Sequence, residues 1–151
     1  MMSASGGSYL IFMLGGERYA FDLRQVAEVG EPPELWPIPC APPCYVGAMN
    51  FHGAIVAVLD LRRFLGLAGQ APLNKNIVLA PSVAGLSLLV EKVLRMVPAD
   101  SVSLRDVEGG DEAERHIVLV DGEALVLDAA ELARRASEQI SGWGAPAAYT
   151  P

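Results

Sequence analysis

The sequence predicts a mainly β fold, made of two small related β-barrels that pack closely, with one C-terminal helix covering an open side. Three features support this prediction: many short β-type runs separated by turns, an internal repeat, and one long segment with helical periodicity. Hydrophobic residues make up 52% of the 151 residues, which allows a sizeable core and argues against general disorder.

Short runs rich in Val, Ile, Leu and aromatic residues recur along the chain and are typical of strands. They occupy residues 9–14, 18–23, 54–61, 76–80, 85–90, 116–120 and 123–128. Turn signals between runs are Gly15-Gly16, Pro32-Pro33, His52-Gly53, Gly109-Gly110 and Asp121-Gly122. We expect His52-Gly53 and Asp121-Gly122 to form two-residue hairpin turns, because Gly suits the left-handed conformations that such turns need.

The two halves of the chain match each other when the numbering is shifted by 67 or by 68. At an offset of 67, hydrophobic residues fall on hydrophobic residues: Ile11 on Val78, Phe12 on Leu79, Leu23 on Val90, Val26 on Val93 and Val29 on Met96. At an offset of 68, Val58-Leu59-Asp60 falls on Val126-Leu127-Asp128, and Phe64 falls on Leu132. A half of this size is marginally stable alone, so we expect the halves to share a core.

Each copy of the repeat ends a strand with an Asp that precedes a helical segment. We expect Asp60 and Asp128 to cap these helices by accepting hydrogen bonds from free N–H groups of the first turn. Gly66 is expected to end the first, short helix in a left-handed conformation. The second helix is predicted over residues 128–140, with Glu131 completing its first turn. Its apolar stripe is expected to contain Leu132, Ala136 and Ile140.

Charge and hydropathy restrict the classes of partner. The formal net charge of −7 argues against nucleic acid or an anionic membrane surface as the main partner. No apolar run approaches the roughly 18 residues of a membrane span, so we expect no direct membrane insertion. Residues 1–8 do not resemble a signal peptide, which favours a cytoplasmic location. We expect residues 1–8 and 141–151 to be flexible.

The sequence offers no recognisable set of catalytic residues. It contains neither a P-loop nor a nucleophile elbow, and Gly15-Gly16 lacks the third glycine of a dinucleotide site. The segment Gly109–Glu112 resembles part of a diguanylate cyclase signature, but Ala113 follows it and no α/β scaffold surrounds it. His52 has no nucleophile or orienting group near it in the sequence, so a turn or surface role is the better interpretation. We therefore expect no enzyme activity.

Two cysteines lie in a proline-rich segment, at Cys40 and Cys44. We interpret them as reduced thiols, because two ligands are too few for a structural zinc site. His52 and His116 could complete a ligand set if folding brought them close. A small-molecule or metal sensor that uses these four residues is the alternative hypothesis for the function of the chain.

A patch of mixed character follows the second strand-like run. Val26 and Val29 alternate with the charged residues Arg24 and Glu28. This segment is either another strand or turn that feeds the core, or an apolar spot surrounded by charge, which is typical of a protein-binding surface.

The ordered set of motifs resembles the CheW family of chemosensory coupling proteins, from Tyr9 to about Leu132. The opening segment 9–29 is similar to the first two strands of that family and the segment after them. Residues 38–66 are similar to its central signature: a Pro-rich entry, an Asn-x-Arg-Gly turn and an apolar strand that ends in Asp-Leu. Residues 85–97 and 125–132 resemble the motifs of its second half.

The resemblance implies two five-stranded SH3-like barrels, approximately residues 9–70 and 71–140, without catalytic activity or cofactor. It implies a scaffold that joins the cytoplasmic tip of a methyl-accepting chemoreceptor to the regulatory domain of a CheA-type histidine kinase, for flagellar chemotaxis or pilus-based motility. By position, the implied kinase-binding residues are Val26, Glu28 and Val29. The implied receptor-binding residues are Asn50, His52, Gly53, Ile77 and Met96.

The chain departs from the family pattern at three of these motifs. His52 occupies the position of the family's Arg, Glu91 replaces an Asp, and Ala57 replaces a Pro. Arg carries a permanent charge and five donors, whereas His is mostly neutral near pH 7. The substitution at His52 therefore bears directly on the choice of receptor.

Overall fold

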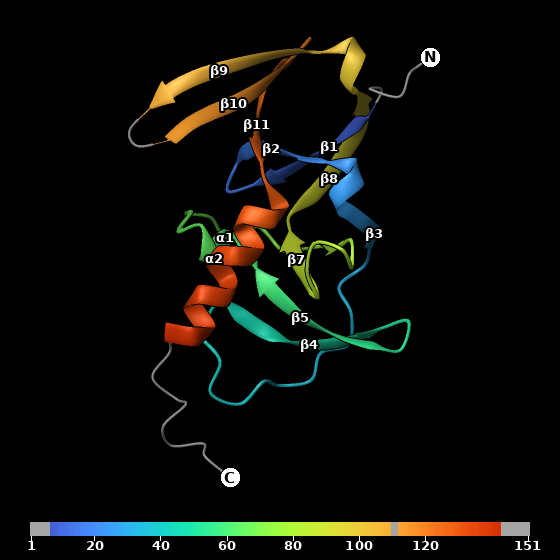
Figure 1. Ribbon diagram of the computed structural model, residues 1–151, viewed down its shortest axis with the longest axis vertical. Helices are drawn as coiled ribbons and strands as arrows, with labels where there is room; N and C mark the ends of the chain where they lie inside the picture. The colour runs from blue at the N-terminus through green and yellow to red at the C-terminus, as the bar shows by residue number, and fades with distance from the viewer. Residues whose placement is uncertain (1–6, 110–111, 143–151) are drawn as a thin grey trace.

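The computed structural model describes residues 7–109 and 112–142, which fold into strands with two α-helices and two short 3₁₀ helices (Figure 1). The first half contains β1 (Ser8–Leu14), β2 (Glu17–Asp22), η1 (Leu23–Gln25), β3 (Val26–Gly30), β4 (Tyr45–Phe51), β5 (Ala54–Asp60) and α1 (Leu61–Phe64). The second half contains β6 (Lys75–Leu79), β7 (Leu86–Val90), β8 (Lys92–Pro98), η2 (Ala99–Ser101), β9 (Ser103–Gly109), β10 (Glu112–Leu119), β11 (Gly122–Leu127) and α2 (Ala129–Gly142). The mainly β prediction with a C-terminal helix is confirmed.

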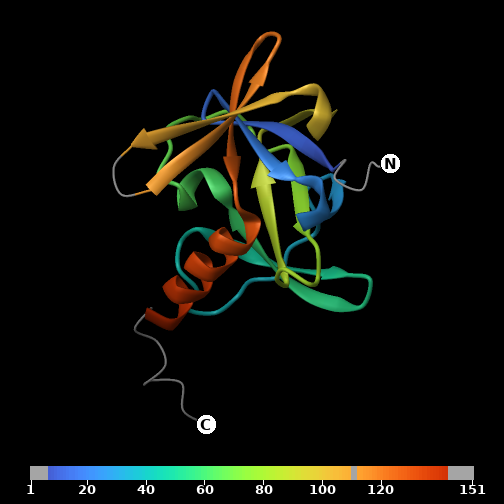
Figure 2. The same ribbon diagram turned by 45° about the horizontal axis from the view of Figure 1, so that its top comes forward.

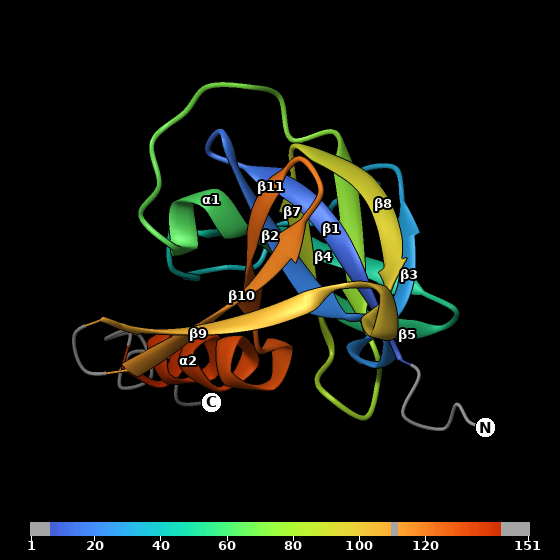
Figure 3. The same ribbon diagram turned by 90° about the horizontal axis from the view of Figure 1, so that it is seen from above.

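The strands form two sheets with the same internal order. One sheet has the order β8-β1-β2-β11-β10-β9, and the other has the order β3-β6-β7-β5-β4. In both sheets a parallel pair joins two antiparallel groups: β11 pairs with β2, and β5 pairs with β7. Seen from above, β11, β2, β1 and β8 follow one another across the first sheet (Figure 3). The hairpins β4–β5 and β9–β10 lie at opposite ends of the molecule (Figures 1 and 2).

The sheets do not follow the division of the sequence into halves. The β1–β2 hairpin of the first half joins the strands of the second half, and β6–β7 of the second half joins the strands of the first. A boundary near residue 70 therefore divides the two copies of the sequence repeat, but it does not divide the sheets, because each sheet contains strands from both copies. Within the described residues neither sheet closes on itself, and the sheets have six and five strands where two five-stranded barrels were expected.

The pairing register reproduces the repeat residue by residue. Val29 lies opposite Ile77 on β6, and its counterpart Met96 lies opposite Leu10 on β1. The same β-bulge interrupts both pairings, next to Val26 in one sheet and next to Val93 in the other. The repeat that relates Val29 to Met96 in the sequence is therefore also a structural equivalence of the two edge strands.

The core has a shared part and two separate parts. The shared cluster takes buried residues from both sheets and both α-helices, including Phe12, Phe21, Leu59, Leu88 and Leu132. A second cluster surrounds Ile11 in the first sheet, and a third surrounds Val78 in the other sheet. Ile11 and Val78 are equivalent in the repeat, so each sheet has its own apolar interior in addition to the shared core.

The helix signals are confirmed in most details. The Asp60 carboxylate accepts a hydrogen bond from the backbone N–H of Arg63 at 2.9 Å, and Asp128 accepts one from Ala130 at 3.0 Å. Gly66 adopts φ 70° just after α1. The apolar stripe of α2 buries Leu132 and Ala136, but Ile140 is 47% exposed, because the helix extends past the core it covers.

One hairpin turn was predicted at the wrong position. His52-Gly53 forms the two-residue turn of β4–β5, with Phe51 opposite Ala54. In the second half Leu119 lies opposite Gly122, so Val120 and Asp121 form the turn and Gly122 already belongs to β11. At the offset of 68 that relates Asp60 to Asp128, His52-Gly53 corresponds to Val120-Asp121. The repeat, rather than the position of the glycine, therefore predicts where this turn lies.

A proline-rich segment explains why one sheet has a strand fewer. The repeat that relates Asp60 to Asp128 also relates Trp36 to Leu104 on β9, and Trp36 forms a single antiparallel bridge to Ala48 on β4. Prolines around Trp36 lack the N–H groups that a ladder requires, so the pairing does not extend. The segment thus runs beside β4 without becoming a strand.

The expected flexible ends fall largely outside the described residues. Ser8 already belongs to β1 and residues 141–142 belong to α2, while residues 1–6 and 143–151 lie outside the description. In the part of the chain that is described, no helix is long and apolar enough to cross a membrane.

Candidate partner-binding groove

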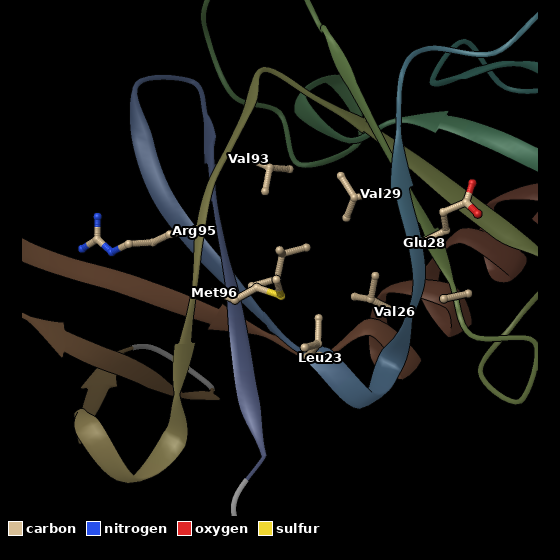
Figure 4. Close-up of a pocket in the computed structure, with 9 residues that line it drawn as sticks. Leu23, Val26, Glu28, Val29, Val93, Arg95 and Met96 are labelled. Atoms are coloured by element: carbon tan, nitrogen blue, oxygen red, sulfur yellow. The ribbon is translucent and has the colours of Figure 1, made fainter.

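A groove of about 440 Å³ lies between the edge strands β3 and β8 (Figure 4). Most of its wall is apolar, with one charged residue on each strand. It is lined by Leu10, Leu23, Val26, Ala27, Glu28, Val29, Val93, Arg95 and Met96. In Figure 4 the side chains of Leu23, Val26, Val29, Val93 and Met96 converge on the groove from the two strands.

The internal repeat creates this groove. β3 and β8 are equivalent strands, and each is the outermost strand of its sheet. Val26 is equivalent to Val93 and Val29 to Met96, so the two walls present matching apolar positions. Leu10, which is 2% exposed, belongs to the strand beside β8 and connects the groove to the shared core.

Apolar side chains remain exposed on both walls. Val29 is 37% exposed and Met96 is 61% exposed. Exposed apolar side chains grouped in a depression and bordered by charge are typical of a protein-binding site. Met is also suited to such a surface, because its unbranched side chain adapts to different partners.

The charged residues of the groove differ on the two walls. On the β3 side, Glu28 Oε1 lies 3.7 Å from His52 Nε2, and both side chains are largely exposed. On the β8 side, Arg95 donates a hydrogen bond to Asp121 at 2.9 Å, and Arg18 donates one to the same oxygen at 3.0 Å. The hydrogen bond from Arg95, assisted by that from Arg18, lowers the pKa of Asp121.

The hairpin that carries His52 is fixed by local geometry. His52 adopts φ 51° and Gly53 adopts φ 89°, so both residues of the turn are left-handed. The Asn50 side-chain oxygen accepts a hydrogen bond from the Gly53 N–H at 2.9 Å, which closes the turn. The ring of His52 packs edge-on against Phe51, with 4.4 Å between centroids. This places the His52 side chain at the surface beside Glu28.

The structure brings together residues that the sequence assigned to two partners. Val26, Glu28 and Val29 line the groove, and so does Met96, which the resemblance placed in the receptor set. His52 lies next to Glu28, and Asn50 and Gly53 form the same hairpin turn.

Ile77 does not belong to any surface. It is fully buried in the shared core, and it reaches the groove only indirectly, as the partner of Val29 in the sheet. Its expected role as a receptor contact is wrong for this conformation, because its side chain packs into the core.

Sequence reasoning missed part of the groove. Leu10, Leu23, Val93 and Arg95 line it but were not assigned to a site. The repeat contained the signal for two of them, because Val93 is the counterpart of Val26 and Arg95 is the counterpart of Glu28. What the sequence did not contain was the proximity of β3 and β8.

The residues of the alternative sensor hypothesis lie apart. Cys40 is exposed, whereas Cys44 is buried and its thiol lies 3.2 Å from Gln139 Oε1 on α2. Burial raises the pKa of the Cys44 thiol, which disfavours the thiolate that binds metals. His116 instead lies beside Glu114 on its own strand, β10, and beside Glu123 on β11. Across residues 7–109 and 112–142, no three His, Cys, Asp or Glu side chains gather in a metal-binding group.

Comparisons with known proteins agree with the fold. The family model of the CheW-like domain matches residues 8–137. The chain is 31% identical over 137 residues to the chemotaxis protein CheW of Klebsiella aerogenes, covering 80% of this chain and 82% of that protein. It is 27% identical over 107 residues to CheW of Rhizobium meliloti, covering 69% and 67% of the two chains. It spans 59% of the length of CheW of Treponema pallidum, at 27% identity over 103 residues.

The fold is also similar to that of a solved structure. The scaffolding protein TtCheW from Thermoanaerobacter tengcongensis superposes with a TM-score of 0.66, covering 80% of this chain and 88% of that one. At 23% sequence identity this likeness supports the fold.

Proposed function

The chain belongs to the CheW-like family, and from that premise we propose that it is a non-catalytic adaptor that couples a chemoreceptor to a CheA-type histidine kinase. The curated relatives are chemotaxis proteins, and the structural relative is a scaffolding protein. The kinase partner is its regulatory domain, the receptor partner is its cytoplasmic tip, and the adaptor works in the cytoplasm, at arrays formed by its partners.

The groove between β3 and β8 carries this proposal. It exposes the apolar side chains of Val29 and Met96 to water. Such exposure does not stabilise an isolated protein, and grouped exposed apolar side chains are typical of a binding site. Because residues expected for the kinase and residues expected for the receptor share this groove, one partner occupies it at a time.

An adaptor needs a second surface for its other partner. The outer edges of the two sheets offer exposed apolar side chains at equivalent positions, Trp36 at 50% and Leu104 at 47% exposure. They lie beside β4 and on β9, the strands furthest from β3 and β8 in their sheets. The second partner therefore binds at one of these edges.

The test is co-precipitation of the purified protein with a kinase regulatory domain and, separately, with a receptor tip. Val29→Asp places a charge in the apolar groove and should weaken binding of one of the two partners at least tenfold, with a smaller effect on thermal unfolding. Val120→Asp is the matched control, because Val120 is fully exposed in the β10–β11 turn, outside the groove.

Met96→Asp should weaken binding of the same partner as Val29→Asp. If the two substitutions affect different partners, the groove does not act as one site. If neither partner binds the native protein, the adaptor function itself is wrong. Unfolding in step with loss of binding by Val29→Asp would show that Val29 serves the core.

A further inference from the structure

The two walls of the groove are outermost strands that their sheets hold weakly at the starting end. Among the described residues β3 pairs with β6 alone, and β8 pairs with β1 alone. A β-bulge interrupts each pairing, between Val26 and Glu28 on β3 and between Val93 and Arg95 on β8. Because a bulge disrupts the ladder of hydrogen bonds, the start of each wall depends on contacts from outside the ladder.

The parallel strand pairs bring a helix to the start of each wall. β2 pairs in parallel with β11, and β7 pairs in parallel with β5. Parallel strands end at the same edge of a sheet, so the segments that follow them lie close together. β2 leads through η1 into β3 while β11 leads into α2, and β7 leads into β8 while β5 leads into α1. Each wall therefore starts near the first turn of a helix.

On the β3 side, Gln25 joins the wall to α2. Gln25 directly precedes β3, and its side-chain oxygen accepts a hydrogen bond from the Ala129 N–H at 3.0 Å. Its side-chain nitrogen donates one to Asp128 at 3.1 Å. The backbone carbonyl of Gln25 also accepts a hydrogen bond from the Ala80 N–H, just after β6, at 2.8 Å. Gln25 thus ties the start of β3 to the first turn of α2.

On the β8 side, Glu91 makes the corresponding connection to α1. Glu91 directly precedes β8 and is 7% exposed. Its carboxylate accepts hydrogen bonds from Arg62 on α1 at 2.8 Å and from the Gly15 N–H at 2.7 Å. Its backbone N–H donates to the Met13 carbonyl of β1 at 3.3 Å. Hydrogen bonds to an ionised group are stronger than neutral ones, so this connection is the firmer of the two.

The two connections are not copies of one residue. The offset of 67 pairs Gln25 with Lys92 and Arg24 with Glu91. Arg24 is exposed and bonds Asp22 on its own segment, rather than a helix. The same link between a wall and a helix is therefore made in each sheet by a different residue type. Its recurrence with different chemistry points to a role for the link itself.

We propose that Gln25 and Glu91 are positioning residues for the groove, each holding the start of one wall against a helix and so setting the spacing between the walls. Neither residue lines the groove, so both act through β3 and β8. A site that is already in its binding geometry binds more tightly, because less order has to be gained on association. The effect on binding rests on the proposed adaptor function, whereas the effect on the spacing does not.

A purely structural role would lower the melting temperature and leave the groove of the folded protein unchanged. The spacing is therefore measured in the folded protein, well below its melting temperature. Nitroxide labels are attached at Ala27→Cys on β3 and Leu94→Cys on β8, both exposed positions. Cys40→Ser and Cys44→Ser in the same chain restrict labelling to the two walls. Pulsed electron paramagnetic resonance then gives the distribution of distances between the labels, which should be narrow for the otherwise native chain.

Gln25→Met preserves the approximate length of the side chain but removes both of its hydrogen bonds, and should broaden or shift this distribution. Glu91→Gln removes the charge from the second connection and should do the same. Gln139→Met is the matched control, because it makes the same chemical change near the other end of α2, away from the walls. Asp128→Ala keeps the bond between Gln25 and the Ala129 N–H, and should leave the distribution narrow.

Binding is measured on the unlabelled protein, with whichever of the kinase regulatory domain and the receptor tip is weakened by Val29→Asp. Gln25→Met and Glu91→Gln should each weaken this partner about two- to tenfold, whereas Gln139→Met should not. Thermal melting of each variant confirms that it is folded at the temperature of the measurement.

A distribution that stays native in both Gln25→Met and Glu91→Gln would overturn the inference, and so would equal broadening in Gln139→Met. Broadening without loss of binding would show that the spacing does not matter to the partner, and would overturn it as well. If the native protein binds neither partner, the adaptor function fails, while the distances still decide whether the two residues hold the walls.

Discussion

The two halves of the molecule share their architecture but differ in their surface chemistry. β1–β2 and β6–β7 have the same pairing register, and β3 and β8 carry the same bulge. Yet Glu28 corresponds to Arg95, the His52-Gly53 turn corresponds to Val120-Asp121, and the segment around Trp36 corresponds to β9. Positions that hold the fold have been kept similar in both copies, while positions on the surface have become different.

Each half of the chain contributes a hairpin to the sheet of the other half, so we expect the two halves to unfold together. Phe12 on β1 and Leu79 on β6 are equivalent, fully or almost fully buried, and located in different sheets. Phe12→Ala should lower the free energy of unfolding by about 3 to 5 kcal/mol and Leu79→Ala by about 2 to 5 kcal/mol. Urea unfolding followed by both tryptophan fluorescence and circular dichroism should show one transition for each variant.

Two separate transitions, with one sheet retained, would show that the halves fold independently. Leu104→Ala is the control, because Leu104 is exposed on β9 and its truncation should change stability by less than about 0.5 kcal/mol.

A buried ion pair joins Arg62 of the first half to Glu91 of the second, and the repeat does not duplicate it among the described residues. Glu91 accepts hydrogen bonds from Arg62 at 2.8 Å and from the Gly15 N–H at 2.7 Å, and it ties α1 to the β1–β2 turn. Its counterpart in the first half, by the repeat that relates Leu23 to Val90, is Arg24, which is exposed. Glu91→Gln should lower the free energy of unfolding at pH 7 by about 1.5 to 3 kcal/mol, the usual value of hydrogen bonds to charged groups.

The same pair predicts a pH dependence. Burial acts to raise the pKa of Glu91, but the hydrogen bonds from Arg62 and Gly15 outweigh it, and the pKa lies below the ordinary value of 4.5. A lowered pKa stabilises the folded state fully above the ordinary value, and this stabilisation is lost as the pH falls through the lower, folded-state value. The stability difference between native protein and Glu91→Gln should therefore narrow below about pH 4.5.

Denaturant titrations at several pH values would measure this narrowing. Glu31→Gln is the matched control, because Glu31 forms an exposed pair with Lys75 and should contribute less than about 1 kcal/mol. A difference that stays constant down to pH 3 would show that Glu91 acts through packing rather than through its charge.

The two helix caps allow a finer comparison. Asp60→Ala should lower stability by about 0.5 to 2 kcal/mol. Asp128→Ala should fall at the upper end of this range, because Asp128 also accepts a hydrogen bond from Gln25 Nε2 at 3.1 Å, and Gln25 in turn accepts one from the Ala129 N–H at 3.0 Å. Thermal unfolding gives both values, and partner binding should be unchanged when corrected for stability. Loss of binding at unchanged stability would contradict the capping role.

The sequence predicted what depends on local pattern and on the repeat. Asp caps, the His52-Gly53 turn and the equivalence of Val29 with Met96 follow from residue type and offset, and the structure has all of them. The exchange of hairpins could not be predicted, because similar halves give β1 equally good apolar partners in β3 and β8. The family resemblance, carried over by position, assigned Val29 and Met96 to two different partners, although both line one groove.

The smallest predicted effect concerns the turn residue that differs from the family pattern. His52 stands where the family has Arg, and it lies beside Glu28 on the β3 side of the groove. An Arg carries a permanent charge and five donors that can hold a carboxylate of the partner, which a His does not match. Because Glu28 lies beside this position and competes for that charge, His52→Arg should strengthen binding of a receptor tip only a fewfold.

Receptor-tip affinity of the native protein, His52→Arg and His52→Ala tests this expectation. His52→Arg should bind a conventional receptor tip more tightly than the native protein does, and His52→Ala should not. Residue 52 adopts φ 51° in the turn, so Gly53 stays unchanged in every variant and thermal melting serves as the control. If neither substitution alters binding, His52 serves the turn alone and the receptor does not contact this position.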